Sequence, residues 1–190
     1  MVTKVKIPES KVTTGKFDKT KFGELILCIA SKSKDDEKFG SIKLNKILYY
    51  SDFFAYRFLG HSITGADYMN LAEGPAPKQL LSVRNELISK GLLDLEYRSY
   101  FNGIQQRPVA KRECNEHLFE PDELDIVDQV IKGLRDCNGK EVSDISHREY
   151  GWRLTEESDI IPYRTAWLSS EPLTQDQIQY GIKLSEQLNV

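Results

Sequence analysis

Hydrophobic positions are distributed most unusually between Ser41 and Gly60. At ~100° per residue, one face of a helix over this segment would carry Leu44, Ile47, Leu48, Ala55 and Phe58. The opposite side would carry Tyr49, Phe53 and Tyr56, beside Asn45 and Lys46. A helix that is apolar nearly all round is either buried centrally or keeps a second surface for a partner. The pattern therefore predicts a central helix and leaves the role of its second face open.

Other segments show the same helical spacing of apolar residues. A first helix is predicted to begin at Asp18, whose carboxylate can cap free amides at the helix start. Ser41 is the predicted N-cap of the central helix, and Gly60 is expected to close it in the left-handed conformation. Further helices are predicted over 78–90, 121–137, 140–150 and 174–188.

The segment after residue 92 changes to the period of a strand. Leu93, Leu95 and Tyr97 alternate with charged residues, which is typical of a β-strand. Asn102-Gly103 is a strong turn signal and predicts a return strand over 105–111. The class is therefore mainly α (α+β): one compact helical domain of five to six helices with one small antiparallel hairpin.

Length favours a single domain, since the chain has 190 residues. We expect a flexible basic arm over 1–16, the helical domain over 17–168, and a C-terminal helix within 169–190 that packs on the domain or extends it. The arm is rich in lysine and has no periodic apolar pattern.

Composition excludes several classes of protein. The formal net charge of −3 gives no overall nucleic-acid footprint. No apolar run is long enough for a bilayer span, and the N-terminus lacks the apolar segment of a secretory signal. Cys28, Cys114 and Cys137 are odd in number and widely spaced, so we expect free thiols and a cytoplasmic location.

No motif predicts a metal, a cofactor or an enzyme. Cys114 and His117 form one ligand-like pair without a matching second pair. Ser143, Ser146 and His147 are close in sequence, but such neighbours on a helix point in different directions. Walker and dinucleotide glycine loops are absent from the sequence.

Helix 78–90 followed by a hairpin over 92–112 suggests an alternative function, because this arrangement resembles a winged-helix reader of DNA. Its candidate phosphate contacts are Lys78, Arg84, Lys90, Arg98 and Arg107. Acidic residues in the same unit weigh against this interpretation.

A last cluster of histidine and aromatic residues begins at Ser146, near the end of the predicted helix 140–150, and continues to Tyr163. A tryptophan beside a glycine that ends a helix usually covers the edge of a core. We expect these residues to form a structural latch: Ser146, His147, Trp152, Pro162 and Tyr163.

Several blocks together resemble the Panacea domain of SocA-like antitoxins, over about residues 17–168. The blocks are KLNKILYY from residue 43, the GPAP turn from residue 74, and SHREYGW from residue 146. The resemblance implies a non-catalytic protein that binds and neutralises a cognate toxin, in one branch by delivering it to a protease. It implies no catalytic residues and no cofactor.

The second face of the central helix agrees with this implication, because interfaces are enriched in tyrosine, phenylalanine and arginine. The candidate partner-binding residues are Asn45, Lys46, Tyr49, Phe53, Tyr56 and Arg57. The alternative is that the rings form a second layer of the core, covered by the loop over 61–76. The sequence leaves the toxin and the oligomeric state unspecified.

Overall fold

The computed structural model describes residues 15–100, 103–168, 175, 179, 182 and 183. This part of the chain contains six α-helices, two short 3₁₀ helices and two antiparallel two-stranded sheets, which confirms the mainly α prediction. The predicted arm, apart from its last two residues, and most of the predicted C-terminal helix lie outside the described residues.

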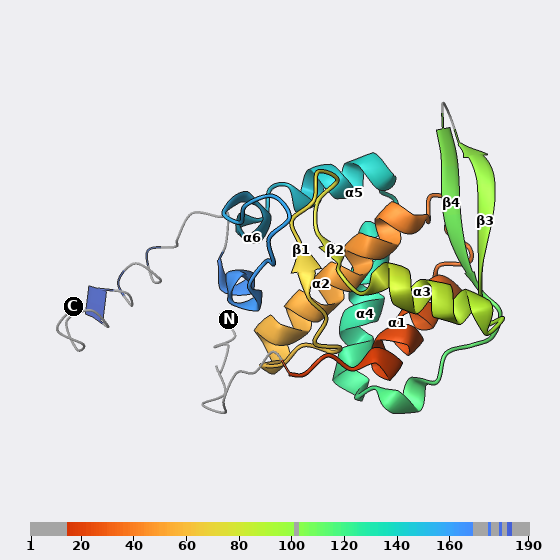
Figure 1. The fold of residues 1–190 in the computed structure, drawn as a ribbon. Helices are drawn as coiled ribbons and strands as arrows, with labels where there is room; N and C mark the ends of the chain where they lie inside the picture. The colour runs from red at the N-terminus through yellow and green to blue at the C-terminus, as the bar shows by residue number, and fades with distance from the viewer. Residues whose placement is uncertain (1–14, 101–102, 169–174, 176–178, 180–181, 184–190) are drawn as a thin grey trace.

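The centre of the fold is α2 (Ser41–Leu59), which crosses the body next to α1 (Lys19–Lys32) and α4 (Pro121–Leu134) (Figure 1). The cap predicted for α1 is confirmed, because the Asp18 carboxylate accepts from the Lys21 amide at 2.9 Å. Gly60 ends α2 in the left-handed conformation, also as predicted. The N-cap of α2 is Gly40 and not Ser41, whose hydroxyl donates to the carbonyl oxygen of Gln106.

The predicted hairpin is formed by β3 (Leu93–Tyr100) and β4 (Gly103–Ala110), which stand at one side of the helical body (Figure 1). A second, smaller sheet was not predicted: β1 (Tyr68–Met69) pairs with β2 (Ala76–Pro77) inside the segment expected to be a loop. This small sheet shapes the turn over 70–75, in which Gly74 lies against Lys46 of α2 and against Ser146.

Of the remaining helices, α3 (Leu80–Ser89) is close to its predicted place, and α5 (Gly139–Ser146) ends four residues before its predicted end. The helix α6 (Tyr150–Arg153) and the 3₁₀ helices η1 (Glu116–Leu118) and η2 (Tyr163–Trp167) were not predicted. Asn138 is the N-cap of α5, and its side chain and Glu141 form a reciprocal capping box. Gly151 lies inside α6 rather than ending a helix, and its bare backbone allows Thr165 to approach closely.

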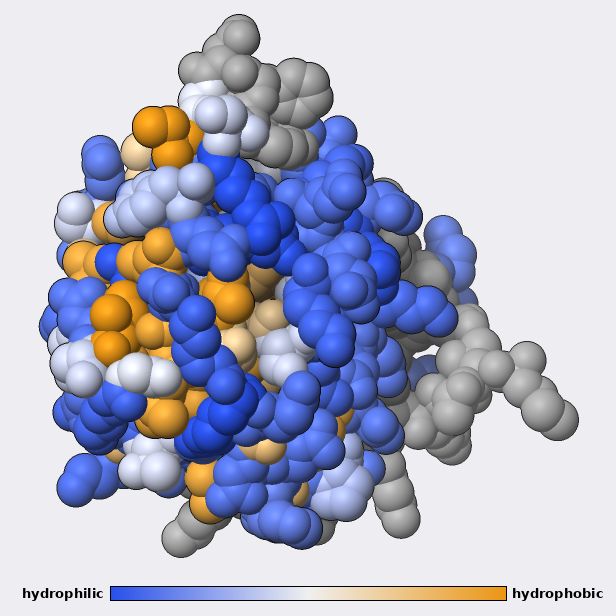
Figure 2. Space-filling view, turned by 90° about the vertical axis from the view of Figure 1, so that its right-hand side faces the viewer, coloured by the Kyte–Doolittle hydropathy of each residue, from blue (hydrophilic) through white to orange (hydrophobic). Residues whose placement is uncertain are grey.

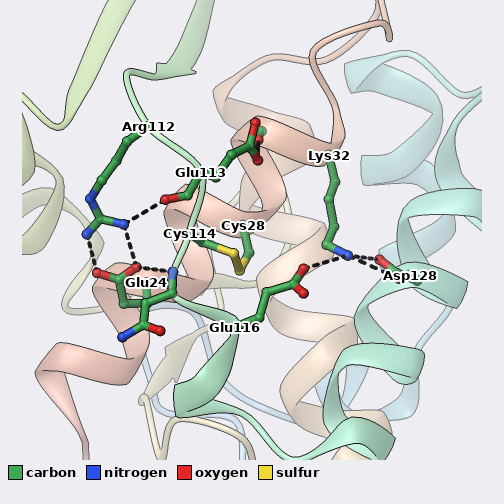
Figure 3. The surroundings of a disulfide bond; sticks show 10 residues. Glu24, Cys28, Lys32, Arg112, Glu113, Cys114, Glu116 and Asp128 are labelled. Atoms are coloured by element: carbon green, nitrogen blue, oxygen red, sulfur yellow. Dashed lines mark hydrogen bonds and ion pairs between the residues drawn. A yellow bond between two sulfur atoms is a disulfide. The ribbon is translucent and has the colours of Figure 1, made fainter.

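The expectation of free thiols is wrong for two of the three cysteines. Cys28 of α1 and Cys114 form a disulfide with their Cα atoms 4.9 Å apart (Figure 3). Ion pairs reinforce this junction, since Arg112 binds Glu24 and Lys32 binds Glu116. The Arg112 guanidinium lowers the pKa of the Glu24 carboxyl. Cys137 remains free.

No helix within the described residues has both the length and the apolar character needed to cross a membrane.

Candidate functional site

The second aromatic face of α2 is buried rather than exposed. Tyr49, Phe53 and Tyr56 are only 3%, 3% and 8% exposed, so the prediction of an open surface formed by these rings is wrong. Tyr163 of η2 covers them, with its ring 4.5 Å from that of Phe53 and 5.5 Å from that of Tyr56. Tyr68 of β1 closes the cluster with its ring 5.5 Å from that of Tyr49. These three rings therefore form a second layer of the core, which was the alternative prediction.

A buried carboxylate fixes this second layer in place. Asp52 is fully buried and accepts hydrogen bonds from the Thr64 amide at 2.8 Å, the Thr64 hydroxyl at 2.6 Å and the Tyr68 hydroxyl at 2.7 Å. Burial raises the pKa of Asp52, and these hydrogen bonds oppose the shift. The loop after α2 is thus tied back onto the helix by a satisfied buried acid.

A second row of aromatic residues lies one position further around α2 and becomes accessible toward the end of the helix: Tyr50 is buried, Phe54 is half-buried and Phe58 is exposed. Tyr50, Phe54 and Phe58 follow each other at intervals of four residues, with ring centroids 5.5 Å and 6.0 Å apart. Phe58 was predicted to face the core, but its side chain is 56% exposed. Arg57 lies over the Phe58 ring, 5.6 Å from its centroid. We call Tyr50, Phe54 and Phe58 the aromatic stripe.

The aromatic stripe forms one wall of a groove of about 530 Å³. The facing wall is the apolar side of α4, and the end of the groove is formed by Ile145 and Glu149. The Glu149 carboxylate is half-buried, and burial raises its pKa although the Tyr50 hydroxyl and Arg57 oppose the shift. Of the candidate partner-binding residues, only Arg57 lines this groove, and Asn45 is half-buried on α2.

Lys46 is a buried cation and not a surface residue. It is 1% exposed, and its ammonium group donates to the carbonyl oxygen of Pro75 at 3.1 Å. Burial lowers the pKa of Lys46 to about 8, with a smaller opposing effect of Glu73. Gly74, at φ +88°, passes so close that a Cβ there would collide with the Ser146 hydroxyl and press tightly against the end of the Lys46 side chain. The backbone of the GPAP turn therefore packs directly on Lys46 of α2.

Two of the predicted latch residues, Trp152 and Ser146, contact the turn over 70–75, and His147 packs on Trp152. The Trp152 indole donates to the carbonyl oxygen of Leu71 at 3.0 Å, and its ring stacks on His147 with centroids 4.1 Å apart. Ser146 lies against Gly74. The other two residues lie elsewhere: Tyr163 covers the buried aromatic face, and Pro162 caps η2.

The alternative DNA-binding set loses one member. Arg107 is 3% exposed, and its guanidinium donates to four backbone carbonyls, those of Ser33, Lys34, Asp36 and Phe39. It therefore fastens the loop after α1 to β4 and is unavailable to a phosphate. Arg98 pairs with Glu96 and Lys90 with Glu86, Arg84 is half-buried, and Lys78 is exposed.

The side of the molecule that carries the hairpin also shows hydrophobic residues, crossed by hydrophilic ones (Figure 2). Tyr97 and Ile104 of the hairpin are 63% and 74% exposed. Scattered exposed apolar residues are usual on protein surfaces. Within the described residues, no group of three or more His, Cys, Asp or Glu side chains is placed to hold a metal ion.

The fold and the site define a mainly helical domain whose central helix is buried over most of its length and is accessible near its C-terminal end, at Phe54, Arg57 and Phe58. The chain matches the family of SocA-like antitoxins with a Panacea domain over residues 44–153, more than half of its 190 residues, and it belongs to this family. It is therefore an antitoxin of the kind found in toxin–antitoxin systems. No curated protein and no solved structure matches the chain.

Proposed function

We propose that this antitoxin neutralises a cognate toxin by binding it directly, without a catalytic step of its own. The side chains nearest to a nucleophilic arrangement support this, because they have structural partners. Ser143 donates to the carbonyl oxygen of Glu73 at 2.9 Å and Ser146 to that of Ser143 at 2.8 Å, while His147 stacks on Trp152. Neither hydroxyl is hydrogen-bonded to a general base, which nucleophilic catalysis requires.

The observation that carries the proposal is the open groove beside the aromatic stripe. A folded monomer normally buries its aromatic side chains, whereas here Phe54 is only half-buried and Phe58 is 56% exposed. Aromatic residues on an accessible wall are typical of protein-binding surfaces. Neutralisation could follow from occlusion of the toxin, from chaperoning it in an inactive form, or from its delivery to a protease.

We place this action in the cytoplasm, where an antitoxin meets a toxin that is made alongside it. The disulfide between Cys28 and Cys114 is not required by this proposal, since the junction also has the ion pairs of Arg112 and Lys32. Reduced cysteines would leave those contacts in place.

Co-expression tests the proposal. The product of the neighbouring reading frame should arrest growth when it is expressed alone, and this chain should restore growth. Copurification of the two proteins would show direct binding, and the half-life of the toxin with and without this chain separates occlusion from protease delivery. Restored growth without a complex would contradict the binding step, and unrelieved arrest would contradict the proposal as a whole.

DNA binding remains the alternative function. Its candidate cations are largely paired or buried, and the net charge is −3, so we expect no salt-sensitive binding of the chain to its own promoter. Promoter binding that weakens steeply with salt would favour this alternative.

A further inference from the structure

The groove between α2 and α4 has the dimensions and lining of a helix-binding site. Its aromatic wall extends from Tyr50, which is 5% exposed, to Phe58, which is 56% exposed, about 12 Å along α2 at 1.5 Å per residue. This length matches about two turns of a second helix laid along the groove. On α4, Gly133 lines the groove without a side chain, and a Cβ at this position would meet no atom within 4 Å. A partner backbone can therefore approach α4 closely at this point.

The Glu149 carboxylate in the groove has only a weak hydrogen-bond donor. The Glu149 carboxylate is half-buried, and the Tyr50 hydroxyl that donates to it lies 3.4 Å away. Hydrogen bonds between two oxygen atoms are usually 2.5–3.0 Å long, so this contact is weak. Arg57 is near enough to favour the charged form of Glu149, but no basic residue of the described part forms an ion pair with it. A carboxylate in such a place favours an added cation.

Resting on the proposed function, we propose that the groove binds an amphipathic helix of the toxin. Aliphatic side chains spaced at i, i+4 and i+7 on this helix contact the aromatic stripe, and a lysine or arginine at the edge of the helix pairs with Glu149. Helices in apolar grooves are recognised in this way, with the apolar anchors supplying affinity and the charged pair fixing orientation. The partner is thus defined as a basic amphipathic helix.

The test uses the full chain and the toxin from the neighbouring reading frame. Phe58→Ser removes the most exposed ring of the stripe, and Leu81→Ser is its matched control, because Leu81 is 63% exposed on α3, outside the groove. Titration calorimetry should show that Phe58→Ser raises Kd at least tenfold, and growth rescue should fail in parallel. Leu81→Ser should bind as the wild type does. Circular dichroism melting verifies that both variants are folded.

Charge is tested separately at Glu149. Glu149→Lys should raise Kd more than Glu149→Gln does, because it places two like charges together, and hydrogen exchange should show protection of α2 and α4 in the complex. Wild-type rescue that Phe58→Ser leaves unchanged overturns the groove while the proposed function stands. Equal binding by the two Glu149 variants overturns the basic helix as occupant. Absence of any complex overturns both proposals.

A second copy of this chain is the competing occupant. Sedimentation of the protein alone decides this point, since a dimer that Phe58→Ser converts to monomer assigns the groove to self-association and overturns the proposal. A monomeric wild type supports it.

Discussion

Replacing Lys46 by methionine should reveal the free energy that a buried cation costs this fold. Its ammonium group has lost nearly all contact with water, and its hydrogen-bond acceptor is the carbonyl oxygen of Pro75 at 3.1 Å. Burial lowers the pKa of Lys46 from 10.5 to about 8. Methionine is similarly long and carries no charge, so Lys46→Met removes the ionisation and largely keeps the volume.

The sign and size of the effect follow from the two pKa values. The folded protein releases the Lys46 proton at a lower pH than the unfolded chain does, so the unfolded state binds more protons between about pH 8 and 10.5. Stability contributed by this group therefore rises with pH across that window. Between pH 7 and 9.5, the free energy of unfolding of the wild type should gain about 2 kcal/mol relative to Lys46→Met.

Urea denaturation at the two pH values measures this gain. Subtracting one protein from the other removes titrations that both share, and a Cys137→Ser background in both prevents thiol exchange at alkaline pH. If the difference in free energy of unfolding between the two proteins is the same at pH 7 and 9.5, Lys46 is not desolvated. That result would refute the packing of the GPAP turn over Lys46 of α2.

Three further results are expected from other buried contacts. Phe53→Ala should lower the free energy of unfolding by about 3–5 kcal/mol in urea titrations, because it opens a cavity among the aromatic rings. A loss below about 1 kcal/mol would show that Phe53 lies at the surface. Arg107→Lys should cost about 2–3 kcal/mol, since a lysine cannot reach all four carbonyls; a wild-type melting temperature would contradict this. Cys28→Ser should lower the free energy of unfolding by up to about 4 kcal/mol under oxidising conditions, because the crosslink spans 86 residues, and by little with reductant present. Thiol titration of the unfolded wild type should find one free thiol, whereas three would show that the crosslink is absent.

Local rules predicted the elements well, and long-range contacts decided the rest. Asp18 and Gly60 act at the two ends of their helices through their own backbone or neighbouring amides, so the sequence sufficed. The orientation of α2 depended on Tyr163, which is more than one hundred residues away in the chain and covers the face that had been expected to stay open. A helical projection shows that two faces are apolar but cannot show which of them another segment will cover.

The same limit explains the errors at Arg107 and at the disulfide. An arginine in a hairpin looks like a phosphate ligand in the sequence, whereas its carbonyl partners lie 68 to 74 residues earlier. Cys28 and Cys114 have no spacing that signals pairing, because the contact between them depends on how α1 meets the segment after β4. The sequence signal for the aromatic stripe was the spacing of Tyr50, Phe54 and Phe58, which matches the repeat of the helix but does not show that Tyr50 is buried and Phe58 exposed.

The difference between buried and exposed aromatic positions on α2 affects how such a protein can change its target over generations. Two positions five residues apart on α2 differ in burial, since Phe53 is 3% and Phe58 56% exposed, so substitution at Phe53 disrupts the interior while substitution at Phe58 would alter the wall of the proposed groove. Selection can therefore retune specificity through a few interchangeable side chains on an invariant scaffold. A small helical domain built in this way can acquire new targets without first having to acquire a new fold.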